Sequence, residues 1–157
     1  MNKSNLLCSF LVSLLASMLI YGTSVASENQ RPYLKDVDKF FELMDEGKPE
    51  EALLGVYLSS PFKGELEATM RNVAFQLANL NRTHGEYQSH EVLIHKVVAE
   101  RFAYLMFFVA YDRQPFKVEF QFYRPDEEWF FHKFSFSDNI DDELVEAAKI
   151  KLLNDYP

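Results

Sequence analysis

The residues of this chain that could do chemistry are tyrosines, histidines and acidic side chains, and the chemistry they suit is proton transfer. Burial and hydrogen bonding can push the pKa values of a hydroxyl donor and a neighbouring acid or base apart, and such a pair can then move a proton to or from a substrate. The hydroxyl donors that could line an apolar pocket are Tyr57, Tyr87, Tyr104 and Tyr111. The acids and bases that could accompany them are Glu91, His95, Asp112 and His132.

None of these residues stands in a catalytic motif, so the sequence predicts no catalytic residue. Tyrosines also fill the margins of hydrophobic cores with the hydroxyl at a wet edge, and this interpretation suits all four. Asp112 fits a hairpin turn, where aspartate bonds the local backbone. The sequence contains neither a Gly-rich phosphate loop nor a Gly-x-Ser-x-Gly nucleophile motif. We therefore expect no cofactor.

The spacing of the histidines does not indicate a metal site. His90 and His95 differ by five positions, so a regular strand places them on opposite faces, whereas Glu91 and His95 share a face. Two ligands are too few for a closed site. His84 falls in an expected turn, and His132 lies far downstream. We therefore expect no bound metal.

The first 26 residues have the layout of a secretory signal peptide. Lys3 is the only charge before an apolar stretch from Leu6 to Tyr21, and Ser24 and Ala26 are the small residues that a cut after Ala26 requires. The apolar stretch is shorter than the roughly 20 residues of a spanning helix. We expect residues 1–26 to be removed, and residues 27–157 to form one domain that is periplasmic or secreted and not membrane-spanning after processing.

Composition narrows the class of partner. Cys8 is the only cysteine and lies within the leader, so the exported domain has no disulfide. This suits a bacterial periplasm better than a disulfide-framed extracellular module. The net charge of −8 repels nucleic acid and anionic lipid surfaces. The partners left are an apolar small molecule, an envelope protein or a second copy of the chain.

Helices are expected before and after a sheet, because apolar residues recur at helical spacing in these parts of the chain. Gly47 ends the first helix, Pro49 opens the second, and a turn over 81–85 follows the third. The expected helices cover residues 32–46, 49–57, 64–80 and about 140–153.

More than half of the aromatic residues lie between Phe102 and Phe136, in runs that are typical of antiparallel strands. The second of four expected strands is apolar on both faces, so both faces must be covered. In the last strand Trp129 and Phe136 differ in parity, and a one-residue bulge near His132 would bring them to one side and bend the sheet. The expected strands cover residues 87–100, 101–111, 116–123 and 129–136.

Helices followed by a bent four-stranded antiparallel meander and a closing helix make an α+β domain. This order resembles the nuclear transport factor 2-like superfamily, in particular its small exported bacterial members, over about residues 36–136. The features that carry the resemblance are the helix ending near Gly85, the strand pair around 91–111, and the close at 123–129 with Phe134 and Phe136. The resemblance implies a strongly curved sheet around helices, a cone with a pocket at its wide end, and dimerisation through the outer face of the sheet.

The superfamily includes isomerases, cyclases, dehydratases, transport adaptors and secretion-machine subunits, so the fold assigns no activity. We expect a non-enzymatic exported domain that binds an apolar small molecule or a protein partner as a homodimer. One alternative is an isomerase or lyase for a hydrophobic substrate in the cone, where isomerase-like members need an acid beside a tyrosine. The other is an accessory subunit of an envelope machine. The candidates for a pocket are Tyr57, Tyr87, Tyr104, Tyr111, His95 and His132, and those for an interface, according to which side of the second strand faces outward, are Leu105, Phe107 and Phe108.

Processing of the leader gives the first prediction. Protein recovered from the soluble envelope fraction of the native host should have the intact mass of a chain that starts at Ser27, or within a residue or two of it, because the cleavage pattern ends at Ala26. Full-length chain in the membrane fraction would show instead that the apolar stretch is retained as an anchor.

Overall fold

The computed structural model describes residues 31–142, 144–146 and 149. The leader expected over residues 1–26 and half of the closing helix expected over 140–153 lie outside the described residues. The chain divides into two units, Met1–Pro32 and Tyr33–Pro157, and the helices and strands of the described residues belong to the second.

Within the described residues, four helices precede the sheet: α3 (Tyr33–Asp45), α4 (Pro49–Tyr57), α5 (Lys63–Ala78) and α6 (Leu80–His84). The first helix ends as expected, because Gly47 takes a φ of 71° and the amide of Lys48 donates back to the Leu43 carbonyl at 2.8 Å. Pro49 then opens α4, with Glu50 and Glu51 in its positively polarised first turn.

Helical structure continues further than expected after α5. The side-chain amide of Asn79 donates to the Phe75 carbonyl at 2.7 Å, and α6 follows where the sequence predicted a turn over 81–85. Gly85 ends this segment with a φ of 86°. A Cβ at Gly85 would lie 2.6 Å from the Cβ of Asp112, so both the backbone conformation and the close approach require glycine here.

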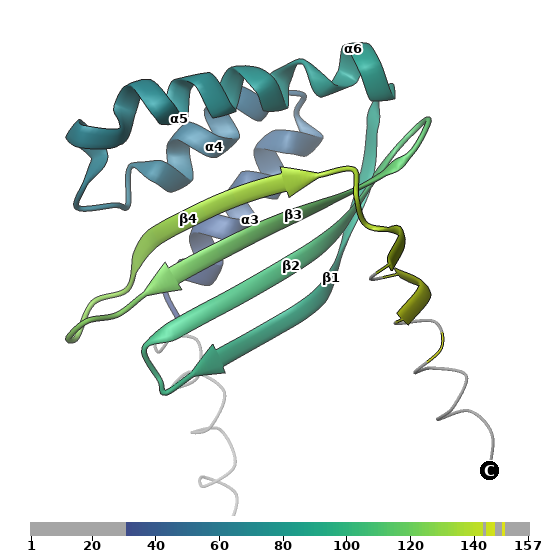
Figure 1. Ribbon diagram of the computed structural model, residues 1–157. Helices are drawn as coiled ribbons and strands as arrows, with labels where there is room; N and C mark the ends of the chain where they lie inside the picture. Colours follow the sequence, from purple (N-terminus) through teal and green to yellow (C-terminus); the bar gives the residue numbers. More distant parts are fainter. Residues whose placement is uncertain (1–30, 143, 147–148, 150–157) are drawn as a thin grey trace, which may run out of the picture. The chain divides into compact units, whose positions relative to one another are not determined.

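The sheet contains β1 (Tyr87–Val98), β2 (Phe102–Tyr111), β3 (Pro115–Tyr123) and β4 (Phe130–Ser137), all paired antiparallel. Its order is β1-β2-β3-β4, so each strand pairs with its neighbour in sequence, and β1 and β4 are the edges (Figure 1). The four expected strands and the α+β class are confirmed. The sheet is an open meander and does not close on itself.

The expected bulge in the last strand is confirmed. The pairing of β4 with β3 skips His132, which is therefore an extra residue in the ladder. The shift lets Trp129 and Phe136 both pack against the hydrophobic core, although their parity differs.

The first strand has two irregularities that the sequence analysis did not locate. Its pairing with β2 skips Gln88 and Leu93. Because Leu93 adds one residue between them, His90 and His95 share one face of β1. The expectation that these histidines lie on opposite faces is wrong, and so is the expectation that Glu91 and His95 share one.

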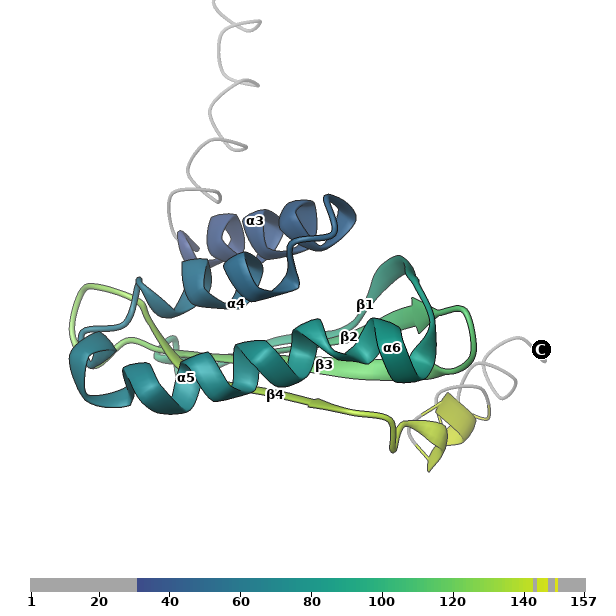
Figure 2. The same cartoon turned by 90° about the horizontal axis from the view of Figure 1, so that it is seen from above.

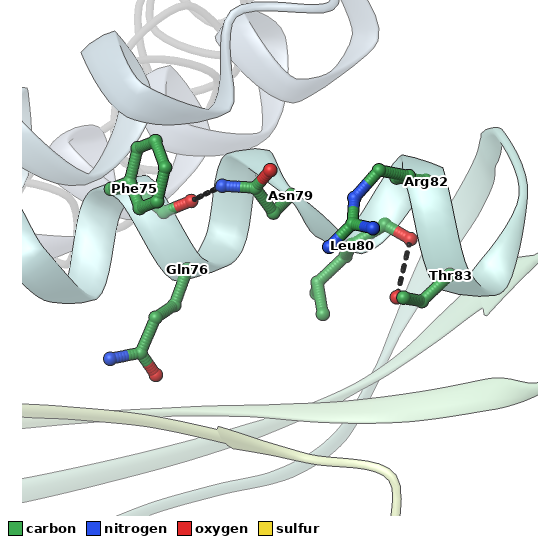
Figure 3. A pocket seen from close by; sticks show the side chains of 6 residues that line it. All are labelled: Phe75, Gln76, Asn79, Leu80, Arg82 and Thr83. Carbon is green, nitrogen blue, oxygen red and sulfur yellow. Dashed lines mark hydrogen bonds between the residues drawn. The ribbon is translucent and has the colours of Figure 1, made fainter.

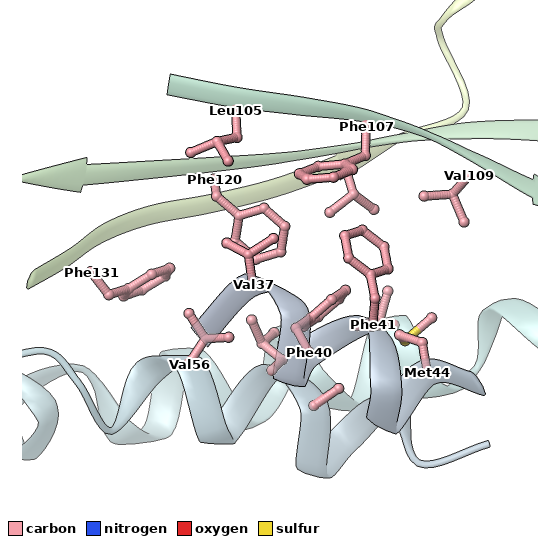
Figure 4. Packing of buried hydrophobic residues seen from close by; sticks show 14 of the residues in the cluster. Val37, Phe40, Phe41, Met44, Val56, Leu105, Phe107, Val109, Phe120 and Phe131 are labelled. Carbon is pink, nitrogen blue, oxygen red and sulfur yellow. The ribbon is translucent and has the colours of Figure 1, made fainter. Parts of the chain in front are cut away.

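The hydrophobic core lies between one face of the sheet and the helices α3, α4 and α5. In Figure 2, α3 and α4 lie to one side of the strands, and in Figure 4 the side chains of Val37, Phe40 and Phe41 point from α3 toward the sheet. Phe120 of β3 is fully buried at the centre of this layer, with ring centroids 5.1 Å from Phe40 and 6.0 Å from Phe107. Edge-to-face contacts of this kind add to the burial of area.

The opposite side of the sheet is called the outer face below. Leu105 and Phe107, two of the three interface candidates, are buried in the core on the helix side. Phe108 points the other way, because successive residues of a strand alternate between faces. The outer face of β2 is formed by Phe102, Tyr104, Met106, Phe108 and Ala110, which are half-buried except for the buried Met106.

The central position of Phe120 generates a prediction for stability. Phe120→Ala should lower the free energy of unfolding by about 3–5 kcal/mol, because it removes the ring from a packed layer that cannot collapse around the cavity. The matched control is Phe75→Ala on α5, whose side chain is 63% exposed, and which should change stability by less than about 1 kcal/mol. Urea unfolding followed by circular dichroism measures both, and equal effects would contradict the placement of Phe120 in the core.

Candidate functional site

A cluster of polar side chains lies where α3 runs beside β1. Tyr87 and His90 come from β1, and Asp38 and Asp45 come from α3, seven residues apart and therefore on one side of that helix. Both aspartates are exposed, whereas Tyr87 and His90 are half-buried. The cluster is thus open to solvent on the helix side and apolar beneath.

The imidazole of His90 is held tightly at the base of this cluster. Its Nδ1 atom lies 2.7 Å from the Tyr87 hydroxyl oxygen. Its ring stacks on Phe41 with centroids 3.7 Å apart and planes 8° from parallel, and the Phe107 ring meets it at 6.1 Å. These contacts fix the orientation of the imidazole without needing a ligand.

The environment shifts the pKa of each titrating group in a stated direction. Burial raises the pKa of Tyr87, and the charge of Asp45 and a hydrogen bond to it raise that pKa further. Burial lowers the pKa of His90, against the opposing effect of the carboxylates of Asp45 and Asp38. Burial also raises the pKa of Tyr111, whose ring packs against Tyr87, to about 12. At neutral pH the phenols keep their protons and His90 is neutral.

The number of protons available decides the direction of the hydrogen bonds that link Asp45, Tyr87 and His90, a chain of groups called the relay below. The phenol of Tyr87 has one proton, and an ionised carboxylate can only accept. If Tyr87 donates to Asp45, its oxygen accepts from the protonated Nδ1 of His90, and Nε2 of His90 then carries a lone pair. The arrangement is an acid beside a tyrosine with a neutral imidazole beyond, which is suited to accepting a proton or a hydrogen bond.

Most of the other pocket candidates do not join this cluster. The Tyr57 hydroxyl donates to the Phe62 carbonyl at 2.9 Å and also contacts the carbonyl of Lys63, so it ties the α4–α5 turn. His95 contacts the Tyr33 hydroxyl through Nε2 at 3.1 Å. Of the six candidates, Tyr87 and Tyr111 alone come together.

Tyr104 and His132 lie on the outer face. The Tyr104 hydroxyl donates to Glu119 at 2.5 Å, and this carboxylate also accepts from Ser135 at 3.0 Å. His132, the bulged residue, is exposed, with its ring 6.5 Å from that of Phe102.

Asp112 has a structural role that the turn assignment did not foresee. Its carboxylate accepts from the backbone amide of Glu86 at 2.8 Å and from the side chain of Gln88 at 2.7 Å. It therefore joins the β2–β3 loop to the start of β1, beside Gly85, and does not close its own turn.

Two open pockets lie on the helical surface. The first, of about 390 Å³, is lined by α5 and α6, and in Figure 3 Gln76 and Leu80 point from these helices toward the sheet. The dashed bonds in Figure 3 show that Asn79 and Thr83 bond the carbonyls of Phe75 and Leu80 in the same helical segment. The second, of about 550 Å³, lies between the α3–α4 turn and the end of α5. Neither contains a candidate residue from the sequence.

No group of three or more potential metal ligands occurs among the described residues. The helices of the part of the chain that the structure describes include none long and apolar enough to cross a membrane.

Comparisons with protein-family models, curated proteins and solved structures gave no match to this chain. The residues and their geometry therefore carry the whole argument about function.

Sequence reasoning missed three members of the cluster, namely His90, Asp38 and Asp45. His90 was set aside because alternation placed it opposite His95, and the Leu93 bulge reverses that assignment. Asp45 follows Asp38 by seven positions in a clear helical pattern. That spacing was the available signal for a shared acidic side of the helix.

The cluster predicts the titration of His90. Its pKa should lie below the ordinary 6.5, and Asp45→Asn should lower it further by removing a carboxylate that favours the charged ring. Proton NMR of the imidazole measures both, with the exposed Asp138→Asn as a control that should leave the pKa unchanged.

The lowered pKa of His90 also predicts how the stability of the protein depends on pH. Since the folded pKa of His90 lies below the unfolded one, the unfolded chain binds the proton first as the pH falls. This contribution therefore lowers the free energy of unfolding as the pH drops from about 6.5 through the folded pKa. A His90 pKa above 6.5 would contradict the burial of the ring.

Proposed function

We propose that this chain is an exported, non-enzymatic binding domain that holds an apolar small molecule or the apolar surface of a protein partner on the outer face. The observation that carries the proposal is the row of Phe102, Tyr104, Met106 and Phe108 along the outer face of β2. Strand β2 lies inside the sheet, with β1 and β3 on either side. The apolar row therefore runs through the sheet and not along its margin.

The neighbours of this row give it a polar rim. Lys117, Glu119 and Gln121 of β3 are directly opposite Phe108, Met106 and Tyr104. The hydrogen bond from Tyr104 to Glu119 fixes one ring of the row in place. An apolar centre with a polar rim, and with aromatic and methionine side chains in the centre, is typical of binding surfaces.

The proposal includes a homodimer and an exported location. Contiguous aromatic patches are seldom left exposed on soluble monomers, so we expect the bound molecule or partner to cover the outer face. An isologous dimer is the commonest assembly of soluble oligomers, and it can leave that face free for binding. The leader pattern in residues 1–26 supports export to a periplasm or to the outside of the cell.

We also propose that the domain is a variant of the nuclear transport factor 2-like fold, with a cone-shaped sheet and a closing C-terminal helix. Helices before a bulged antiparallel meander support this assignment. The bulge at His132 supplies a local cause for curvature.

The relay of Asp45, Tyr87 and His90 favours a second candidate function, an isomerase or lyase for a hydrophobic substrate. Such enzymes begin by removing a proton from the carbon beside a carbonyl, and neutral His90 would be the base. Solvent deuterium entering a hydrophobic ketone at that carbon, and absent with His90→Gln, would favour this function over the binding domain. If the chain is instead an accessory subunit of an envelope machine, the outer face would be the surface that docks on the machine.

A fluorescent apolar probe tests the leading proposal. Nile red should bind the wild-type protein, and Phe108→Asp should reduce its fluorescence severalfold, because a carboxylate interrupts the apolar row. The control is Phe75→Asp, a substitution of the same type in the pocket between α5 and α6, which should leave the fluorescence unchanged. If Phe75→Asp removes the signal and Phe108→Asp does not, the apolar site is that pocket and the outer face is not used.

A further inference from the structure

Strand β1 is an edge of the sheet with an unusual distribution of side chains. It is 12 residues long and pairs with β2 along one side. Four of its apolar side chains are well exposed, namely Val92 (57%), Leu93 (37%), Val97 (38%) and Val98 (58%). The other side of an edge strand presents backbone groups that can pair with another strand.

Two opposite charges lie on β1, and the bulge places them on the same face. Glu91 is opposite Phe108, and Lys96 is opposite Tyr104, so both project to the outer face. In a regular strand, residues five apart would project to opposite faces, and the extra residue Leu93 removes that difference. Both side chains are exposed, and neither forms an ion pair with another described residue.

This pattern is self-complementary under a two-fold axis. An axis between Leu93 and Ile94 would bring Glu91 opposite a second copy's Lys96, and Val92 opposite a second copy's His95. Each of these pairs joins residues of one face, Glu91 and Lys96 on the outer side and Val92 and His95 on the inner side. A strand that lacked the bulge would not satisfy this register, because its paired residues would lie on different faces.

We propose that two copies of this chain join through their β1 strands, antiparallel, with Glu91 of one copy facing the partner's Lys96 on the outer face. The partner that we name is a second copy because, in this register, each charge of the strand meets the opposite charge of its copy. The inference rests on the homodimer of the proposed function and names its interface. The result is one continuous sheet in which the apolar rows of the two β2 strands share a single outer face.

Charge reversal tests the register. Glu91→Lys alone and Lys96→Glu alone each create two like-charge pairs across the axis, and each should weaken dimerisation by about tenfold or more. The double variant restores two opposite-charge pairs and keeps the composition of the wild type, so its dimer should be as stable as the native one. Sedimentation of the protein recovered from cells expressing the full chain measures the dissociation constants, and circular dichroism checks folding.

Cysteine pairing supplies a second measurement that does not depend on charge. In a Cys8→Ser background, Glu91→Cys with Lys96→Cys should form a disulfide-linked dimer on oxidation, because opposite residues of antiparallel strands are close enough to bridge. Within one strand the two cysteines are roughly 16 Å apart and cannot join. Either single cysteine should stay monomeric on a denaturing gel.

Three results would overturn the proposal. A protein that stays monomeric at all concentrations would contradict both this interface and the proposed homodimer. If the charge reversals leave the dissociation constant unchanged and Phe108→Asp dissociates the dimer, the two copies are joined through the outer face. If all three substitutions leave the dissociation constant unchanged, the dimer uses another surface. In the last two cases the role of the bulge and of Lys96 is to prevent another strand from pairing with the edge.

Discussion

The alternation of side chains along a strand, interrupted at single residues, is the constraint on which the rest of this structure depends. An inserted residue exchanges the two faces for everything that follows it in the strand. In β4 the insertion of His132 allows both Trp129 and Phe136 to reach the core. In β1 the insertion of Leu93 turns His90 and His95 to the helix side, and Glu91 and Lys96 to the outer side.

Helix α3 connects the core to the polar cluster. Phe41 is buried in the core, and the flat of its ring is also the surface on which His90 stacks. The aspartates of the same helix face solvent and influence the pKa of that imidazole. Helix α3 thus determines both how deeply His90 is buried and which charges surround it. A change in the packing of Phe41 would therefore change the pKa of His90.

The fold was more predictable from the sequence than the site. Period-two and helical patterns placed the four strands and the main helices, and the parity of Trp129 and Phe136 revealed the bulge at His132. The bulge at Leu93 left no such trace, because Val92, Leu93 and Ile94 are all apolar and either register looks acceptable. The faces of His90 and Glu91 therefore followed from strand pairing, which a single sequence does not contain. Likewise, nothing local to Asp112 shows that its partners are Glu86 and Gln88.

The order of the elements along the chain has a consequence for folding. Every strand pairs with its immediate neighbour in sequence, so the sheet can assemble hairpin by hairpin, with short loops to close. The helices α3, α4 and α5, which pack on its inner face, are synthesised earlier. Their side chains Phe40, Phe41 and Met44 therefore have no sheet to pack against when they are made. During that interval the helical half exposes an apolar surface, which is the kind of surface that chaperones hold. The appearance of β3, which carries Phe120, is the point in synthesis at which this surface can first be sealed.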